Sequence, residues 1–132
     1  MATASLQRTY TDLDAAFTFN PITDDIALIT NNKAIAFSVK NLILTMNGER
    51  PFNPDLGTPI RHLIFEQFGP MLDVVLKQLI SQVLATYEPR ISVSDIEIDS
   101  QTDQHQLSVT IKYTLLSIST PYSINVVLTR TR

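Results

Sequence analysis

The chain changes from a helical to a strand pattern at Thr86-Tyr87-Glu88-Pro89-Arg90-Ile91. Upstream, apolar residues recur on one face of a helix, and downstream they alternate with polar residues. Pro89 ends the helix, because the residue before a proline is pushed out of the α region. A carboxylate and a guanidinium therefore flank a rigid joint between two structural layers. The pair either holds these layers together within the chain or presents a polar fork to another subunit, and the two roles are compatible.

The helix before this joint is the strongest periodic element. It opens at Gly69-Pro70, since proline suits the first helical turn, and Asp73 lies where the helix dipole favours an anion. A wide apolar stripe follows. Its members are Leu72, Val75, Leu76, Leu79, Ile80, Val83, Leu84 and Tyr87.

After Arg90 the apolar residues have a period of two. In the first strand Ile91 and Val93 alternate, the phase slips at Asp95, and Ile96 and Ile98 resume it, which predicts a bulge. Two further strands alternate without error and are separated by a turn near Ser119-Thr120-Pro121. Their apolar residues are Leu107, Val109, Ile111, Tyr113 and Leu115, then Tyr122, Ile124, Val126 and Leu128. The pattern predicts an α+β fold in which an N-terminal arm and helices pack on a C-terminal three-stranded antiparallel sheet.

The first third of the chain predicts an arm, a short strand and a second helix. Residues 1–24 form the arm, with one short strand at Ala16–Phe19, and residues 25–132 form a single domain that begins with a strand at Asp25–Thr30. Asn31 is the expected helix N-cap and Gly48 the expected end. The apolar face of this helix consists of Ile35, Val39, Leu42, Ile43 and Met46. A proline-rich loop, Glu49–Pro59, and a short helix, Ile60–Phe65, complete this part.

Composition restricts the classes of function. The 132 residues fit one domain, and 44% hydrophobic with 17% charged residues indicates a folded chain. A net charge of −3 gives no basic field for nucleic acid, and the absence of cysteine excludes disulfides and thiolate metal sites. Residues 1–10 lack the apolar core of a signal peptide, and no apolar run approaches the ~18 residues of a membrane span.

Residues that could carry catalysis lack a supporting pattern. His62 and His105 stand alone, and no cluster has the spacing of metal or cofactor ligands. A glycosidase would need two carboxylates, and the candidates are Glu49, Asp55, Glu66 and Glu88. An arginine beside Glu88 would lower the pKa of its carboxyl, which is the wrong direction for a general acid. The sequence therefore favours a protein that is not an enzyme and leaves a peptidoglycan hydrolase as an alternative.

The last strand differs from the first in charge. Asp95, Glu97, Asp99 and Asp103 make the first strand and its turn acidic, whereas Tyr122–Thr129 carries no charge. An uncharged edge strand is usually covered, because its free backbone groups can pair with another chain. We therefore expect this edge to bind a strand of another subunit.

Several segments resemble one known family, the baseplate wedge protein of contractile phage tails that initiates the sheath and is also called lysozyme-like. The segments are Tyr10-Thr11-Asp12-Leu13-Asp14, Asp25-Ile26-Ala27-Leu28, Ala34-Ile35 with Ser38, Asn41-Leu42-Ile43-Leu44-Thr45, Asn47 to Gly57, and Tyr87-Glu88-Pro89-Arg90-Ile91. The Gly-Glu-Arg-Pro-Phe loop followed by Glu-Pro-Arg at this distance is the specific feature. Met46 departs from the family, which often has a polar or basic residue there.

The resemblance implies a structural role in the tail baseplate of a virion assembled in the host cytoplasm. The implied partners are wedge proteins, the tail sheath protein and tube-side baseplate proteins. Charge, apolar runs and ligand spacing already indicate no nucleic acid, membrane or cofactor. The resemblance implies that Glu88, Pro89 and Arg90 contact wedge partners. Arg50 and Phe52 are further candidate contacts, with packing of the loop onto the domain as the alternative. The candidate contacts with the sheath are Tyr122, Ile124, Val126 and Leu128 of the uncharged strand. A type VI secretion homologue is an alternative setting for the same role.

Overall fold

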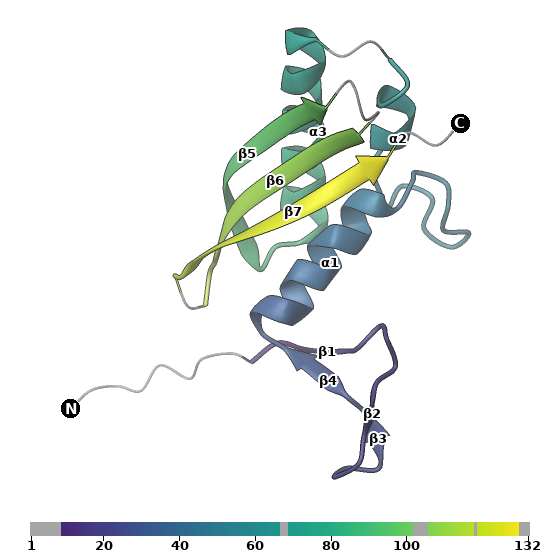
Figure 1. Ribbon diagram of the computed structural model, residues 1–132, viewed down its shortest axis with the longest axis vertical. Coiled ribbons are helices and arrows are strands. Elements are labelled where there is room, and N and C mark those ends of the chain that lie inside the picture. The colour runs from purple at the N-terminus through teal and green to yellow at the C-terminus, as the bar shows by residue number, and fades with distance from the viewer. Residues whose placement is uncertain (1–8, 67–68, 102–105, 118, 130–132) are drawn as a thin grey trace, which may run out of the picture.

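The protein has a layer of helices on one face of a three-stranded sheet and an N-terminal hairpin arm that projects from the helix layer (Figure 1). The computed structural model describes residues 9–66, 69–101, 106–117 and 119–129. The α+β class predicted from the sequence is confirmed.

The sheet is an antiparallel meander of β5 (Ile91–Gln101), β6 (Gln106–Leu115) and β7 (Pro121–Thr129), in that order. The pairing of β5 with β6 shifts between Val93 and Asp95, so the bulge predicted from the phase slip is confirmed. Every predicted inward residue of β6 is buried. The alternation arises because one face of the sheet packs on helices and the other meets water.

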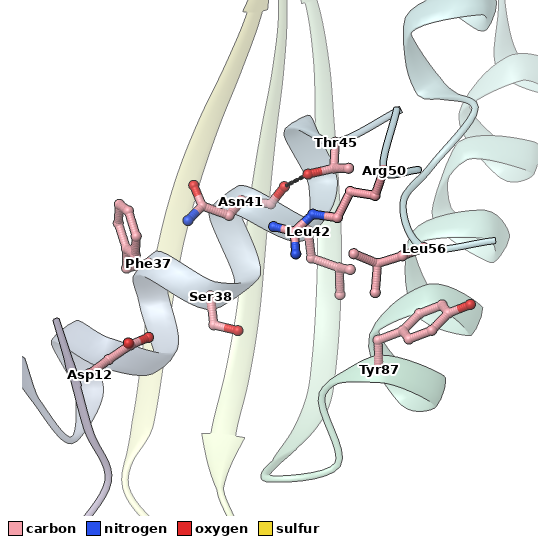
Figure 2. Close-up of a pocket in the computed structure, with 9 residues that line it drawn as sticks. All are labelled: Asp12, Phe37, Ser38, Asn41, Leu42, Thr45, Arg50, Leu56 and Tyr87. Atoms are coloured by element: carbon pink, nitrogen blue, oxygen red, sulfur yellow. Dashed lines mark hydrogen bonds between the residues drawn. The ribbon is translucent and has the colours of Figure 1, made fainter. Parts of the chain in front are cut away.

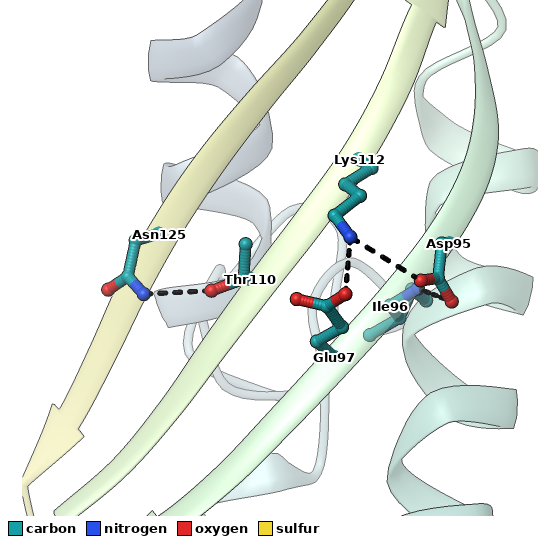
Figure 3. A network of polar contacts seen from close by, with 6 residues as sticks. All are labelled: Asp95, Ile96, Glu97, Thr110, Lys112 and Asn125. Carbon is teal, nitrogen blue, oxygen red and sulfur yellow. Dashed lines mark hydrogen bonds and ion pairs between the residues drawn. The ribbon is translucent and has the colours of Figure 1, made fainter.

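Helices α1 (Asn32–Leu44) and α3 (Pro70–Tyr87) cover that inner face. Viewed from the open face, α1 lies behind β7 and α3 lies behind β5 (Figure 3). Helix α3 begins at Pro70, as predicted, and buries Leu72, Leu76, Ile80 and Leu84. Val75 of the predicted stripe is exposed. The two helices and the inner face of the sheet share one hydrophobic core.

The start of α1 differs from the prediction. Asn31 precedes the helix but makes no side-chain cap, and its φ of 50° lies in the left-handed region. Its side-chain oxygen instead accepts a hydrogen bond from the Tyr10 N–H at 3.3 Å. The Asn31 N–H donates to the Tyr10 carbonyl at 2.6 Å. Pairing with a distant part of the chain thus replaces the local cap.

Helix α1 also ends before Gly48 and before Met46. Thr45 is extended, and its hydroxyl donates to the Asn41 carbonyl at 2.7 Å. The following loop folds back, and the buried hydroxyl of Thr58 donates to the carbonyl of Ile43 at 2.8 Å. The Thr58 N–H donates to the Thr45 carbonyl at 2.9 Å. Thr58, which lies at the far end of the loop, therefore satisfies carbonyls at the end of α1. Helix α2 (Ile60–Leu63) follows directly after it.

The arm is a hairpin of four short strands. Strand β1 (Thr11–Leu13) pairs with β4 (Leu28–Thr30), and β2 (Phe19–Asn20) pairs with β3 (Asp25–Ile26). The strand predicted at Ala16–Phe19 is therefore wrong except at its last residue, and the strand predicted at Asp25–Thr30 is interrupted at Ala27. The Ala27 N–H donates to the Thr18 carbonyl, so residues between Asp14 and Thr18 form a loop that breaks the ladder. The predicted boundary at residue 24 falls inside this hairpin.

The loop approaches the end of α1 closely at Gly57, so the two glycines of the loop should differ in the cost of adding a side chain. A Cβ at Gly57, where φ is +119°, would lie 2.5 Å from the Thr45 carbonyl oxygen. At Gly48 φ is +84°, and a Cβ would meet nothing within 4 Å. We expect Gly57→Ala to lower the free energy of unfolding by about 3 kcal/mol through a backbone clash. Gly48→Ala should cost only ~1 kcal/mol from its positive φ. Urea unfolding measures both, and equal losses would contradict this account of the loop.

Candidate functional site

Glu88 lies at the centre of the candidate site, in the joint between α3 and β5. Its side chain is 2% exposed and accepts hydrogen bonds from Arg90 Nε at 2.5 Å and Arg90 Nη2 at 2.6 Å. The Ser38 hydroxyl of α1 donates to the same carboxylate at 2.7 Å. Of the two roles left open by the sequence, the intramolecular one is therefore present: Glu88 and Arg90 pair within the chain. Burying a carboxylate without such partners would cost several kcal/mol.

The electrostatics of the joint favour a charged Glu88. Burial alone would raise the pKa of its carboxyl, but the hydrogen bonds from Arg90 and Ser38 and the positive charge of Arg90 outweigh burial and lower the pKa. The pKa of Arg90 is raised, chiefly by its hydrogen bond to Glu88. A carboxylate held in the ionised form is a structural anion and a poor general acid.

Arg90 extends the joint to the arm. Its guanidinium carbon lies 5.3 Å from the centre of the Tyr10 ring, a cation–π contact. Tyr10 in turn exchanges backbone and side-chain hydrogen bonds with Asn31 at the start of α1. Because Arg90 is 33% exposed and uses Nε and Nη2 for Glu88, its Nη1 faces away from the pair. The joint thus fixes the base of the arm and keeps part of a guanidinium at the surface.

A second polar contact links the helix layer to the central strand. The Tyr113 hydroxyl of β6 donates to the Asn32 side chain of α1 at 2.8 Å. Burial raises the pKa of Tyr113, and the negative charge of Glu88 nearby raises it further. The ring of Tyr113 lies 6.2 Å from that of Tyr122 on β7. This contact anchors the first turn of α1 over the middle of the sheet.

A cleft of about 270 Å³ lies beside the joint, between α1, the end of α3 and the loop after α1 (Figure 2). Ser38, which binds Glu88, forms part of its wall. The side chain of Arg50 reaches toward α1, and Leu56 lies between Arg50 and Tyr87. The other lining residues are Asp12, Phe37, Asn41, Leu42 and Thr45. The loop after α1 therefore meets the end of α3 at this cleft, through Arg50 and Leu56 on one side and Tyr87 on the other.

The loop that carries Arg50 is held at both ends. The Tyr87 hydroxyl donates to the Asp55 carbonyl at 3.1 Å, and the Glu49 carboxylate accepts the Met46 N–H at 2.9 Å. Phe52 is fully exposed at the tip of this loop. An exposed aromatic ring on a fixed loop has the character of an interface anchor, because little side-chain or loop entropy is lost when it docks.

The inward side chains of the last strand, β7, are not available to a partner, whereas the backbone groups along its outer border are. Val126 and Leu128 are buried against the helix layer, and Tyr122 and Ile124 are half-buried. Within the described residues β7 pairs with β6 alone, so its other border has no strand partner. A contact between this strand and a partner would therefore be made mainly by main-chain groups.

The open face of the sheet is covered with polar pairs (Figure 3). Lys112 of β6 contacts both Glu97 and Asp95 of β5, the latter at 3.8 Å. The Asn125 amide of β7 donates to the hydroxyls of Ser108 and Thr110 at 2.8 and 2.9 Å. These polar side chains bind one another through ion pairs and hydrogen bonds, which is typical of a sheet face that meets water.

The carboxylates considered for hydrolysis do not converge. Glu88 is committed to Arg90, Glu49 and Asp55 lie in the loop, and Glu66 follows α2 at the surface. His62 is exposed on α2, and His105 lies outside the described residues. Among the residues that the structure describes, no group of three or more His, Cys, Asp or Glu side chains could hold a metal ion. No helix in the same part of the chain is long and apolar enough to span a membrane.

Two members of the joint were not foreseen as its partners. Ser38 lies 50 positions before Glu88, and Tyr10 precedes Arg90 by 80. Nothing in either local pattern links these residues. Both lie in segments that carry the family resemblance, and that was the one available signal.

The chain is similar to known proteins in sequence and in fold. A family model described as baseplate wedge protein gp25 matches residues 30–119. Baseplate wedge protein gp25 of Enterobacteria phage T4 is 25% identical over 113 residues, covering 86% of this chain and 85% of that protein. A candidate tail lysozyme from Geobacter sulfurreducens superposes with a TM-score of 0.74 at 21% identity, covering 81% of this chain and 97% of that chain. A chain of the anti-feeding prophage baseplate gives 0.72 at 23% identity, covering 83% and 88%. Structural matches at these identities establish the fold alone.

The joint predicts strong coupling between Glu88 and Arg90. We expect Arg90→Ala to lower the free energy of unfolding by about 3 kcal/mol, because it leaves a buried carboxylate without its counter-ion. Adding Glu88→Gln should recover part of this loss, since the stranded charge is gone. A double-mutant cycle by urea unfolding should give a coupling of roughly 1–3 kcal/mol. Additive effects of the two substitutions would show that the pair does not hold the joint.

The lowered pKa of Glu88 predicts loss of stability in acid. In the unfolded chain this carboxyl has its ordinary pKa of 4.5, whereas folding lowers it. The unfolded state therefore binds more protons, and the contribution of Glu88 is complete above the unfolded pKa and falls as the pH drops through the folded one. Comparing wild type with Glu88→Gln between pH 6 and about pH 3 should show a shallower acid decline for the variant. Parallel curves would contradict the assignment, and Ser38→Ala provides a milder variant for the same comparison.

Proposed function

The chain belongs to the baseplate wedge protein gp25 family, and from this premise we propose that it joins wedge proteins and initiates sheath polymerisation by strand exchange. Membership makes it a structural baseplate component of a contractile tail machine. The proposal adds what the subunit does there. The free border of β7 is the observation that carries it.

An unpaired strand border can take up a strand from another chain. Its N–H and C=O groups are arranged with the spacing of a β ladder, so an incoming segment gains several main-chain hydrogen bonds at once. The nine residues of β7 carry no charge, and its core-facing residues Val126 and Leu128 are buried against the helix layer. We infer that the tail sheath protein supplies this strand, which would make the first sheath ring continue the sheet of the baseplate.

Wedge proteins would contact side chains around the joint and the loop after α1. Arg50 at the cleft, fully exposed Phe52 and the outward part of Arg90 lie on segments fixed by the joint and by the Tyr87–Asp55 hydrogen bond. Guanidinium groups suit bidentate contacts with carboxylates of a partner. Glu88 and Pro89 then act by positioning Arg90, because the Glu88 carboxylate is already used within the chain.

We infer that the subunit has no enzymatic role. The most buried carboxylate is ion-paired and has a lowered pKa, and the others lie apart in structural or surface positions. The proposed location is the tail baseplate of a virion assembled in the bacterial cytoplasm, with tube-side baseplate proteins as further neighbours. A type VI secretion baseplate would use the same geometry, and the neighbouring genes separate the two settings.

The strand-exchange proposal predicts opposite effects of proline at two neighbouring positions. Successive residues of an antiparallel strand direct their N–H groups to opposite sides, so one of Ile124 and Asn125 serves β6 and the other faces the free border. Proline at the residue whose N–H serves β6 breaks the existing sheet. Proline at the residue whose N–H faces the free border removes only a donor of that border. We expect the more stable of Ile124→Pro and Asn125→Pro to enter baseplates yet to reduce the fraction carrying sheath roughly tenfold.

Alanine at the same two positions keeps the N–H groups and provides the matched controls. Truncation would be a poorer test, because β7 contributes Val126 and Leu128 to the core. Electron microscopy of tails measures the sheathed fraction, and unfolding curves rank the two proline variants. Normal sheath on baseplates that contain the more stable variant would refute strand exchange at this border.

A further inference from the structure

The N-terminal arm, residues 11–30, exposes more apolar surface than any role within the chain requires. Five of the twelve large hydrophobic side chains that the described residues leave exposed lie between positions 13 and 28. They are Leu13, Phe17, Phe19, Ile22 and Leu28. Leu13 and Leu28 are direct cross-strand partners and therefore form one continuous apolar patch. An exposed apolar pair, with three further exposed apolar residues on the same short hairpin, is typical of an interaction surface, whereas isolated exposed side chains need no explanation.

The arm is acidic as well as apolar. Asp12, Asp14, Asp24 and Asp25 lie within it, and no Lys, Arg or His occurs between Thr9 and Asn32. Anionic membranes and nucleic acids repel such a surface. The surface that complements it is a protein groove with apolar walls and cationic side chains at its margins.

Hydrogen bonds from its own side chains and backbone stabilise the fold of the arm. Asp14 accepts hydrogen bonds from the Thr18 hydroxyl and the Ala16 N–H, which close the loop before β2. At the tip, Asn20 accepts the Ile22 N–H through its side chain at 3.0 Å. Its carbonyl also accepts the Asp24 N–H at 3.0 Å. A preformed arm loses less entropy when it docks than a disordered tail would.

Phe17 gives the most specific indication. Its φ of 50° places a bulky aromatic residue in the left-handed region, which ordinary L-residues avoid. The Phe17 N–H donates to the Asp14 carbonyl at 2.9 Å within the loop, but the residue is 68% exposed, so packing within the chain does not explain a phenylalanine at this position. Asparagine or glycine would suit this backbone better. A residue that is unfavourable for local folding and points outward is better explained by a contact with a partner.

We propose that the arm docks into an apolar groove with basic margins on a neighbouring baseplate protein, with Phe17 as its anchor. The family model matches from residue 30 onward, so nearly all of the arm precedes the matched region. The inference rests on membership of the baseplate and not on strand exchange at β7. Through Tyr10 and Asn31 the docked arm would be fixed to the same joint that orients the sheet.

The first experiment separates docking from folding at Phe17. Phe17→Asn should leave the free energy of unfolding unchanged or raise it, because asparagine tolerates positive φ. Wild type and variant, supplied at equal amounts with distinct isotope labels, then compete for incorporation into baseplates. We expect mass spectrometry of purified baseplates to show the variant depleted at least tenfold. Val74→Asn is the matched control, since Val74 is similarly exposed on α3, and it should be incorporated as well as wild type.

The second experiment identifies the occupant. A photo-cross-linking benzoylphenylalanine at position 17, in otherwise intact baseplates, should join the arm to another protein at a segment with Lys or Arg beside apolar residues. Asp24→Asn combined with Asp25→Asn should also be depleted in competition, and added salt should reduce this difference.

The outcomes distinguish this inference from the proposed function. Equal incorporation of Phe17→Asn and wild type would overturn docking of the arm, as would equal depletion of Val74→Asn. A cross-link to a second copy of this chain, to lipid or to an acidic segment would do the same. Loss of sheath with normal arm cross-linking would leave the inference standing, whereas absence of the wild-type chain from baseplates would end both.

Discussion

The carboxylate of Glu88 accepts three hydrogen bonds, and the arrangement of the whole molecule depends on them. Because a buried charge without partners is strongly unfavourable, Ser38 of α1 and Arg90 before β5 must stay where they are once Glu88 closes α3. Arg90 in turn positions Tyr10 at the base of the arm. One ionised group thus sets the relation between the helix layer, the sheet and the hairpin. The cleft lies beside this joint, because Ser38 forms part of its wall.

The elements that a local, periodic residue pattern determines were predictable from the sequence. Pro70 and Pro89 bracket α3 through the fixed geometry of proline, and the phase slip at Asp95 located the bulge of β5. The ends of α1 were not predictable in the same way. Asn31 pairs with Tyr10, and Thr58 takes the carbonyl of Ile43, so contacts with distant residues replaced the expected cap at Asn31 and the expected stop at Gly48.

The candidate site was predictable in part for the same reason. The sequence placed Glu88 and Arg90 at a joint between two layers but contained no information on whether their charges meet within the chain. That depended on Ser38, which packing brings against Glu88. The convergence of Arg50 and Tyr87 on one cleft also depended on the way the loop folds back. The alternating residues Tyr122 to Leu128 correctly predicted the position of strand β7. Because Val126 and Leu128 are buried, a partner at this strand would contact mainly its backbone.

The two outer strands of the sheet are unlike each other, and this makes the subunit directional. Strand β5 is bulged after Val93 and carries Glu97 and Asp99, whereas β7 is regular and uncharged. A kinked, acidic margin discourages further strands, and a straight neutral margin accepts them. Strand addition at β7, as proposed, would therefore lengthen the sheet from one side only. Under that proposal the subunit would begin a row of subunits without being inserted into the middle of one, and this would protect it from growing into open-ended fibres.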